Sequence, residues 1–294
     1  MTKNTLLSIQ EASDLLGKSI VTLRRWDEAG VLKSIRQDEK SHRRYDKDDL
    51  LKFLNSQKKP ELKHKVNTFI FDFDSTFFPD ESLDEVLKLT LKNDPNRKEK
   101  SKQIEAICRE GMEGKISFEE SLARRFALAK LHKDDIKKYL EKCSRVSPEM
   151  KRCVAFLRKN SQRVLVVSGG FNRWICPLSK EAGVREEFIF TNRFLFDEAG
   201  FVVGFMEQNP LCRSGGKPKL ISQLKSSGTV VGTVVMIGDG ASDLEVWKAG
   251  QADIFLGFGV YACRPNVQEA APLFFKSIRT FRSFLEKIVG ESNR

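Results

Sequence analysis

The sequence contains little of what several common kinds of active site require. It has three histidines, all outside the segments that look catalytic, so a histidine-based phosphatase and a Ser-His-Asp triad are not expected. It has six cysteines, but none forms the C-x-x-C pair of zinc fingers and thioredoxin-like sites. We therefore expect reduced, scattered thiols, and any phosphate chemistry must use carboxylates.

Long apolar runs are also missing. No stretch approaches the ~18 apolar residues that span a bilayer, and the polar N-terminus lacks the apolar core of a signal peptide. We expect a cytoplasmic protein with no membrane partner.

Positive charge is in excess, and it is densest near the N-terminus. The 294 residues have a formal net charge of +11. Residues 1–65 hold 15 Lys and Arg against 10 Asp and Glu, while the remaining residues hold 36 against 30. A basic chain tends to meet nucleic acid, anionic surfaces or anionic substrates.

Two sections of the chain differ in pattern. Residues 1–57 read as short helices with basic connections, and residues 58–65 form a polar, lysine-rich linker. From residue 66 to 294, apolar strands alternate with amphipathic helices, which predicts an α/β domain with a largely parallel sheet. A helical insertion at about residues 83–147 follows the first strand. The expected strands are 66–72, 163–168, 188–190, 233–239 and 253–257, with a hairpin over 194–205.

Four polar segments of this domain point to phosphate chemistry. The first strand ends in D-F-D-S-T, whose carboxylates are Asp72 and Asp74. S-G-G at Ser168 and G-D-G-A-S-D around Asp239 each follow an apolar strand directly, and S-G-G-K ends at Lys217. A single D-x-D occurs often by chance, but four such segments in this order are typical of an active site.

The residue types fit a covalent mechanism at a phosphomonoester. A carboxylate attacks this dianion only when metal and ammonium charge offset the repulsion. Asp72 would attack phosphorus to form an aspartyl-phosphate, and Asp74 would protonate the leaving alcohol. Asp239 would hold Mg²⁺, and Lys217 would balance the charge. The phosphate oxygens would be held by Ser168, Gly169 and Gly170.

This ordered set of motifs resembles the phosphoserine phosphatases of the haloacid dehalogenase superfamily, from about residue 66 to 270. The resemblance implies a Rossmann-like core, an inserted helical cap and magnesium. It also implies that Asp72 and the backbone carbonyl of Asp74 are metal ligands with Asp239, and that Asp243 supports them. It predicts O-phospho-L-serine as the substrate and the last step of serine biosynthesis as the reaction.

The resemblance assigns residues in and just before the inserted segment, and one later residue, to the substrate. Glu81 takes the position that reads the ammonium group, and Arg125 the position that reads the carboxylate; a planar Arg fork suits a carboxylate. Met112 and Phe118 would wall the pocket, and Ser242 would contact the substrate. The segment Thr191-Asn192-Arg193 and Arg264 also match positions that the family places near the site. Pro79 and the stretch 260–261 depart from the family pattern.

The N-terminal segment reads as a helix-turn-helix followed by a basic wing. S-I-Q-E-A-S-D-L-L-G, T-L-R-R-W-D-E-A-G-V-L and H-R-R-Y-D-K-D-D-L resemble the winged helix of mercury-resistance regulators (MerR type), over residues 5–54. The resemblance implies that Arg24 and Arg25 face the DNA groove, and that Arg43, Arg44 and Tyr45 contact phosphates. The long dimerisation helix of these regulators is missing.

Three hypotheses remain open from the sequence. The first is a metabolic phosphatase with an accessory N-terminal domain that binds DNA, docks on the phosphatase or binds a protein. The second is a DNA-binding regulator whose phosphatase-like domain senses a phosphorylated amino acid. The third is a phosphatase for another small phosphorylated amino acid. The expected partners are a small phosphorylated substrate, DNA, and a second copy of the chain in a homodimer.

Overall fold

The computed structural model describes residues 6–16, 19–28, 32–36, 42–50, 68–160 and 162–292. The chain forms two compact units, Met1–Glu61 and Leu62–Arg294. The predicted linker, residues 58–65, lies outside the described residues, so the domain boundaries stay predictions. In the described parts of the chain, no helix combines the length and apolar character needed to cross a bilayer.

The smaller unit is built on two short helices and a two-stranded antiparallel sheet. Its elements are β1 (Leu6–Ser8), α1 (Ile9–Leu16), α2 (Ile20–Glu28) and β2 (Arg44–Asp46). Ser8 and Glu11 cap α1 reciprocally, and the Ser19 hydroxyl accepts from the Thr22 amide at the start of α2. A small core holds the two helices against the strands; it contains Ala12, Leu23, Leu32, Tyr45 and Leu50.

Parts of the predicted winged helix lie outside the described residues. These are the glycine turns at Gly17 and Gly30, the middle of the basic loop, and the end of the third helix. That third helix was expected to run from Asp46 to about Asn55, and residues 47–50 are helical. The described part therefore contains the two helices of the expected helix-turn-helix.

The larger unit contains a six-stranded parallel sheet in the order β10-β9-β8-β3-β4-β5. The strands are β3 (Thr68–Phe71), β4 (Arg163–Phe171), β5 (Ile189–Asn192), β8 (Val234–Gly238), β9 (Ile254–Phe258) and β10 (Leu273–Phe275). The sheet confirms the expected α/β class and the five predicted core strands. The sequence pattern missed β10, because it has only three residues and only partly buried side chains.

Side chains alternate between the two faces of the sheet and build two cores. On β3, Phe69 and Phe71 face one core while Ile70 faces the other. Helices α8 (Pro148–Lys159) and α13 (Ile278–Ser292) contribute to the first core. The second core receives side chains from α10 (Gly216–Ser226), α11 (Ala241–Lys248) and α12 (Pro265–Ala270). Helices therefore cover both faces of the sheet, so polar groups that need access to a ligand lie at the ends of the strands.

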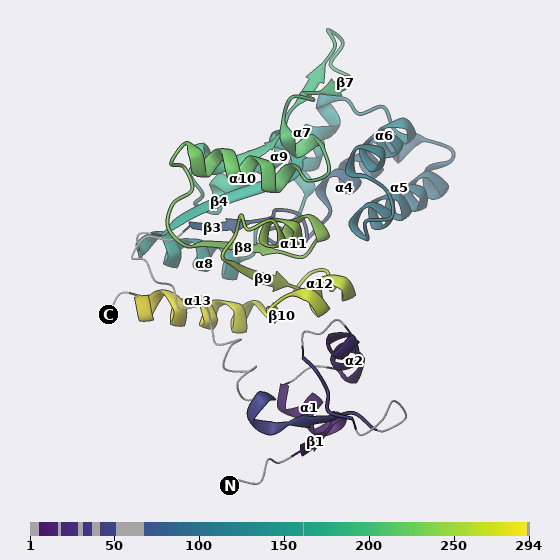
Figure 1. Ribbon diagram of the computed structural model, residues 1–294. Coiled ribbons are helices and arrows are strands. Elements are labelled where there is room, and N and C mark those ends of the chain that lie inside the picture. The colour runs from purple at the N-terminus through teal and green to yellow at the C-terminus, as the bar shows by residue number, and fades with distance from the viewer. Residues whose placement is uncertain are drawn as a thin grey trace. The chain divides into compact units, whose positions relative to one another are not determined.

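A helical cap is inserted directly after β3, as expected. It comprises α4 (Ser82–Thr90), α5 (Arg97–Met112), α6 (Phe118–Leu128) and α7 (Lys133–Lys142), with the short 3₁₀ turn Leu91–Asn93. Figure 1 shows α4, α5 and α6 grouped to one side of the sheet. This insertion places cap side chains above the carboxyl ends of the strands, which is where open α/β sheets bind ligands.

The cap also meets a hairpin of the core. The predicted hairpin forms from β6 (Phe194–Phe196) and β7 (Val202–Phe205) after β5 and α9 (Asn172–Glu181). The Lys133 amide donates to the Gly200 carbonyl at 2.9 Å, and the Val202 amide donates to the Leu131 carbonyl at 2.8 Å. The connection between α6 and α7 is therefore tied to the hairpin by backbone hydrogen bonds.

Candidate active site

Asp72 lies where β3 ends, and a buried lysine meets it there. The Asp72 amide donates to the Ile237 carbonyl at 2.9 Å, which continues the β3–β8 pairing up to this residue. Lys217 Nζ lies 2.8 Å from Asp72 Oδ1 and 2.6 Å from Asp243 Oδ1. Although burial opposes the charge of Lys217, the two carboxylates raise its pKa. The ammonium group therefore stays charged beside Asp72.

Three carboxylates converge at this position. Oxygen atoms of Asp72, Asp239 and Asp243 all lie within 4.8 Å of one another. Burial, followed by the charge of Asp72, raises the pKa of Asp243 to about 8. This crowding of negative charge fits a hard divalent cation such as Mg²⁺, which prefers oxygen ligands and relieves the repulsion. The carboxylate of Asp74 is not part of this three-carboxylate cluster. The family resemblance implies that Asp74 would bind the metal through its backbone carbonyl instead.

Asp239 is held by two neighbours within the core unit. The Thr76 hydroxyl donates to its Oδ1 at 2.8 Å, and Arg264 Nε lies 2.7 Å from its Oδ2. Burial raises the pKa of Asp239, and the guanidinium opposes the increase. The family resemblance predicts Arg264 near the site, but no sequence pattern assigns a role to Thr76. The only signal for Thr76 was its place in D-F-D-S-T.

The segment Ser168–Gly170 forms an irregular end of β4. A Cβ on Gly169 would lie 2.7 Å from the Phe118 ring, and one on Gly170 2.6 Å from Ile175, so a side chain at either position would force these neighbours to shift. The Gly170 amide donates to the Ser168 hydroxyl at 3.0 Å. An amide and a hydroxyl in a loop before α9 are suited to hold anionic oxygens.

Asp74 is connected to the start of the cap. Its Oδ1 accepts from the Ser82 amide, the first residue of α4, at 2.9 Å. Burial, followed by the negative charges of Glu81 and Asp72, raises the pKa of Asp74 well above its ordinary value. A carboxyl group that retains its proton is suited to act as a general acid.

Glu81 precedes α4 and contacts both the core and the cap. Its Oε1 accepts from the Ser75 hydroxyl at 2.8 Å and lies 2.9 Å from Arg264 Nη2. Burial, followed by the charge of Asp239, raises the pKa of Glu81 to about 7. Ser75 has a left-handed backbone with φ of 53°, rare for a residue other than glycine. This turn brings the Ser75 hydroxyl to Glu81.

Arg125 is buried on α6 and forms an ion pair across the cap. Its Nη1 lies 2.8 Å from Asp84 Oδ1, and its Nε donates to the Ser121 carbonyl at 3.2 Å. Both side chains of the ion pair are at least nine-tenths buried, at 6% and 4% exposure. Asp84 raises the pKa of Arg125 against the effect of burial. The guanidinium lines the cavity described next, with a geometry that Asp84 holds in place.

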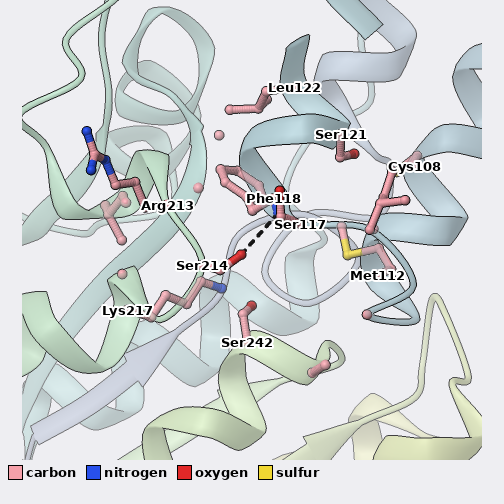
Figure 2. Close-up of a pocket in the computed structure, with 18 of the residues that line it drawn as sticks. Cys108, Met112, Ser117, Phe118, Ser121, Leu122, Arg213, Ser214, Lys217 and Ser242 are labelled. Atoms are coloured by element: carbon pink, nitrogen blue, oxygen red, sulfur yellow. Dashed lines mark hydrogen bonds between the residues drawn. The ribbon is translucent and has the colours of Figure 1, made fainter. Parts of the chain in front are cut away.

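One cavity of about 460 Å³ brings most of the predicted site residues together. Figure 2 shows cap residues such as Met112 and Phe118 opposite core residues such as Lys217 and Ser242. The predicted residues that line it are Asp72, Asp74, Glu81, Met112, Phe118, Arg125, Ser168, Gly169, Gly170, Lys217 and Ser242. Arg193 does not line this cavity; it is exposed beside β5 and lines another cavity.

The cap and the core touch at the mouth of the cavity. The Phe118 amide donates to the Ser214 hydroxyl at 3.1 Å, drawn as a dashed line in Figure 2. The Ser214 amide and hydroxyl donate to Glu119 Oε2 at 3.2 and 3.1 Å. No sequence pattern predicts this contact, since it joins residues 95 and 96 positions apart. These bonds seat Phe118 over the loop at Gly169.

The predicted DNA-binding residues of the smaller unit are in different environments. Arg24 and Arg25 are exposed on α2, and Arg44 is exposed on β2. Arg43 pairs with Asp27 at 2.7 Å and with Glu28 at 3.2 Å. An arginine in these ion pairs is already engaged within its own unit.

Tyr45 requires a correction. It is 1% exposed, and its hydroxyl donates to the Leu23 carbonyl at 3.4 Å within the small core. A phosphate contact needs an accessible phenol, so the expectation that Tyr45 contacts phosphates was wrong. The alternation along β2 turns Arg44 outward and Tyr45 inward.

A parallel sheet with a carboxylate cluster, a buried lysine and a glycine loop at its strand ends defines a capped hydrolase with a Rossmann-like core. A family model for haloacid dehalogenase-like hydrolases matches residues 69–248, and a helix-turn-helix domain model matches residues 6–58. The chain belongs to the haloacid dehalogenase-like hydrolases.

Curated relatives and a solved structure cover most of the larger unit. The chloroplastic phosphoserine phosphatase of Arabidopsis thaliana is 37% identical over 218 residues, covering 74% of this chain and 71% of the relative. The Drosophila melanogaster phosphoserine phosphatase is 30% identical and covers 75% of this chain and 80% of the relative. The solved structure of a phosphoserine phosphohydrolase-like protein from Francisella tularensis superimposes with a TM-score of 0.67 at 30% identity. The superposition covers 74% of this chain and 99% of that protein.

Proposed function

We propose that the larger unit hydrolyses O-phospho-L-serine to L-serine and phosphate, in the last step of serine biosynthesis and in the cytoplasm. The observation that carries the proposal is one cavity with two chemically different ends. Asp72, Lys217 and the glycine loop form an end suited to a phosphoryl group, while Glu81 and Arg125 form an end with both signs of charge. An amino-acid phosphate ester matches both ends, since its phosphate fits the first and its ammonium and carboxylate groups fit the second. The relatives named as phosphoserine phosphatases support this substrate.

The reaction would proceed through a covalent intermediate on Asp72. A carboxylate oxygen of Asp72 attacks phosphorus while the bond from phosphorus to the serine oxygen breaks. Asp74 gives its proton to that departing oxygen, and L-serine leaves. Asp74 then takes a proton from the water that attacks phosphorus, which releases phosphate and frees Asp72.

The surrounding residues would manage charge during these steps. Lys217 compensates the negative charge of Asp72 and the phosphoryl oxygens. Ser168 and the loop amides hold those oxygens in place. Mg²⁺, held by Asp72, Asp239 and the Asp74 carbonyl with Asp243 behind them, would supply positive charge at the phosphoryl group.

The cap side would select the amino acid part of the substrate. Glu81 accepts hydrogen bonds from the ammonium group, and Arg125 donates to the carboxylate. Met112 and Phe118 wall the space between them, and Ser242 contacts the substrate from α11. The third hypothesis, another small phosphorylated amino acid, requires a pocket that fits a different side chain between the α-carbon, held by Glu81 and Arg125, and the phosphoryl group at Asp72.

A substrate panel tests the proposal directly. With Mg²⁺ present, phosphoserine should give a kcat/KM at least about tenfold above those of three other esters. Phosphothreonine carries an extra methyl group on Cβ, phosphohomoserine is one methylene longer, and p-nitrophenyl phosphate lacks the ammonium and carboxylate groups. EDTA should abolish turnover, and added Mg²⁺ should restore it. Equal rates on all four esters would remove the assignment of phosphoserine while leaving the phosphatase in place.

The raised pKa of Glu81 predicts a specific pH dependence. Below pH 7 the free carboxyl group is increasingly protonated, so it can no longer bind an ammonium group as an anion. We expect kcat/KM for phosphoserine to fall up to about tenfold per pH unit below 7. The variant Glu81→Gln should not show this fall of kcat/KM below pH 7. The wild type should not show it with p-nitrophenyl phosphate either, because this substrate has no ammonium group. If kcat/KM falls below pH 7 in the same way for both substrates, the titrating group is not Glu81.

A second function is favoured by the helix-turn-helix match of the smaller unit. We infer that this unit binds DNA weakly, as the MerR-type resemblance implies, because one small module buries little DNA surface. Val21, Arg24, Arg25 and Glu28 form one exposed face of α2. The complete catalytic set argues that the chain is an enzyme that also binds DNA, rather than a sensor. A homodimer stays a prediction.

A gel shift on the full chain tests the DNA contact. Replacing Arg24 and Arg25 with Ala should weaken DNA binding about 10- to 100-fold. It should also make the slope of log K against log salt concentration shallower by about two, since two positive charges at the DNA are lost. The control, Lys137→Ala with Lys138→Ala, removes the same charge from exposed positions of the cap. If both double variants bind DNA like the wild type, α2 is not the DNA-binding element.

A further inference from the structure

Asn192 joins two loops of the proposed active site from outside the cavity. It is the last residue of β5, and its side chain is fully buried. Its Nδ2 donates to the Gly169 carbonyl at 2.8 Å and to the Leu211 carbonyl at 3.1 Å. Its Oδ1 accepts from the Cys212 thiol at 3.0 Å. Only this orientation of the carboxamide sets donors opposite the two carbonyls and an acceptor opposite the thiol.

The first of these bonds reaches into a break in the sheet. Pairing of β4 with β5 stops at Val167 and resumes at Phe171, which lies opposite Asn192. The segment Ser168–Gly170 therefore bulges away from the ladder, and its backbone groups need other partners. The side chain of Asn192 supplies a donor for the carbonyl of Gly169.

The direction of that carbonyl decides where the next amide points. The carbonyl of Gly169 and the N–H of Gly170 belong to one trans peptide group, so they point in opposite directions. With the carbonyl held by Asn192, the N–H faces the other way, toward the Ser168 hydroxyl and the cavity. Glycine peptides rotate with little steric resistance, so this one needs an external anchor.

The second bond reaches the turn that leads to Lys217. Leu211 belongs to the 3₁₀ turn Pro210–Cys212, which precedes S-G-G-K. This turn packs directly on the start of α10, since a Cβ on Gly216 would lie 1.9 Å from the Pro210 carbonyl oxygen. One side chain thus ties the backbone of the glycine loop to the segment that carries the lysine.

We propose that Asn192 is a positioning residue for the phosphoryl group: it orients the Gly169–Gly170 peptide and fixes the distance between this peptide and Lys217. The proposal rests on the proposed phosphatase function, because it assigns phosphate to this loop. Asn192 itself does not line the cavity and touches no substrate. Residues that orient the ligands of a metal site change affinity or activity by about 10- to 100-fold when removed, and we expect the same range for Asn192.

Two substitutions test the role. Asn192→Asp keeps the shape but sets an oxygen opposite two carbonyl oxygens, and Asn192→Ala removes the anchor. Binding of inorganic phosphate, measured by calorimetry with Mg²⁺, should weaken about 10- to 100-fold in both variants. The competitive inhibition of p-nitrophenyl phosphate hydrolysis by phosphate should weaken in parallel. Inhibition by L-serine should not change, because serine contacts the Glu81 and Arg125 end.

A structural control separates positioning from a general loss of stability. Asn160 lies at the end of α8, where its Nδ2 donates to the Phe156 carbonyl at 2.9 Å. Asn160→Ala should lower the melting temperature without changing phosphate binding. Should the Asn192 variants fail to fold, Cys212→Ala loosens the carboxamide more gently and should weaken phosphate binding about threefold, in line with the loss of a weak hydrogen bond.

The outcomes distinguish this inference from the proposed function. Wild-type phosphate affinity in both Asn192 variants, or in the Cys212 variant if those do not fold, overturns the positioning role. Equal loss of phosphate and L-serine affinity also overturns it, since that is the pattern of a distorted fold. A wild-type protein that binds phosphate but hydrolyses no ester would instead count against the phosphatase, and the binding data would still decide the role of Asn192.

Discussion

Replacing Asp72 with Asn should reduce turnover of phosphoserine by at least about 10⁴-fold, as expected when a covalent nucleophile is removed. A carboxamide oxygen carries no negative charge and cannot form an aspartyl-phosphate. Release of inorganic phosphate under multiple-turnover conditions measures the loss. A pulse with radiolabelled phosphoserine should label the wild type on an acid-stable, hydroxylamine-sensitive group and leave the variant unlabelled.

The control for Asp72→Asn is an aspartate outside the cavity. Asp197 accepts from the Phe201 amide in the hairpin turn, so Asp197→Asn changes the same functional group without touching the site. We expect wild-type turnover from it. Melting curves of both variants show whether the fold is kept. A wild-type rate in the Asp72 variant would mean that the nucleophile is misassigned.

Replacing Arg125 with Ala should separate amino-acid recognition from phosphate chemistry. We expect kcat/KM for phosphoserine to fall about 100-fold, close to the cost of truncating one partner of a buried charge pair. For p-nitrophenyl phosphate, which has no carboxylate, kcat/KM should change less than about threefold. Initial rates on both substrates measure the difference.

The ion pair with Asp84 complicates this variant and also supplies its control. Removing Arg125 leaves a buried carboxylate unpaired, which destabilises the fold by about 3–5 kcal/mol. Asp84→Asn breaks the same pair from the other side but keeps the guanidinium. Both variants should melt earlier, but the loss of the preference for phosphoserine should be clearly larger in Arg125→Ala than in Asp84→Asn, because the latter keeps the guanidinium and loses only the carboxylate that orients it. Equal losses on both substrates in Arg125→Ala would remove the carboxylate role.

The sequence pattern was most informative where a strand ends in polar residues. Buried strands followed by Asp72, Ser168 and Asp239 predicted a shared edge, because parallel strands present their carboxyl ends on one side of a sheet. In the confirmed parallel sheet, Asp72 and Ser168 line one cavity at this edge, and Asp239 clusters with Asp72. The short strand β10 carried no such signal.

The contacts that refine the site were not readable from the sequence. Arg264 bridges Asp239 and Glu81, and Ser214 bonds to Glu119 of the cap. Each pair joins segments that are far apart in the sequence and meet only in the folded chain, and no local periodicity encodes that distance. Tyr45 was misplaced for a related reason, since a tyrosine within a basic motif gives no sign of the direction of its side chain.

The order of apolar and polar residues along the chain determined the class of fold, the inserted cap and the catalytic residue types. These depend on local backbone preference and on burial, which act over a few residues. Tertiary structure alone decided which carboxylates converge, which arginine is paired and which amide anchors the glycine loop. Those features arise where segments far apart in sequence meet, and the free energy of such contacts exists only once the chain has folded.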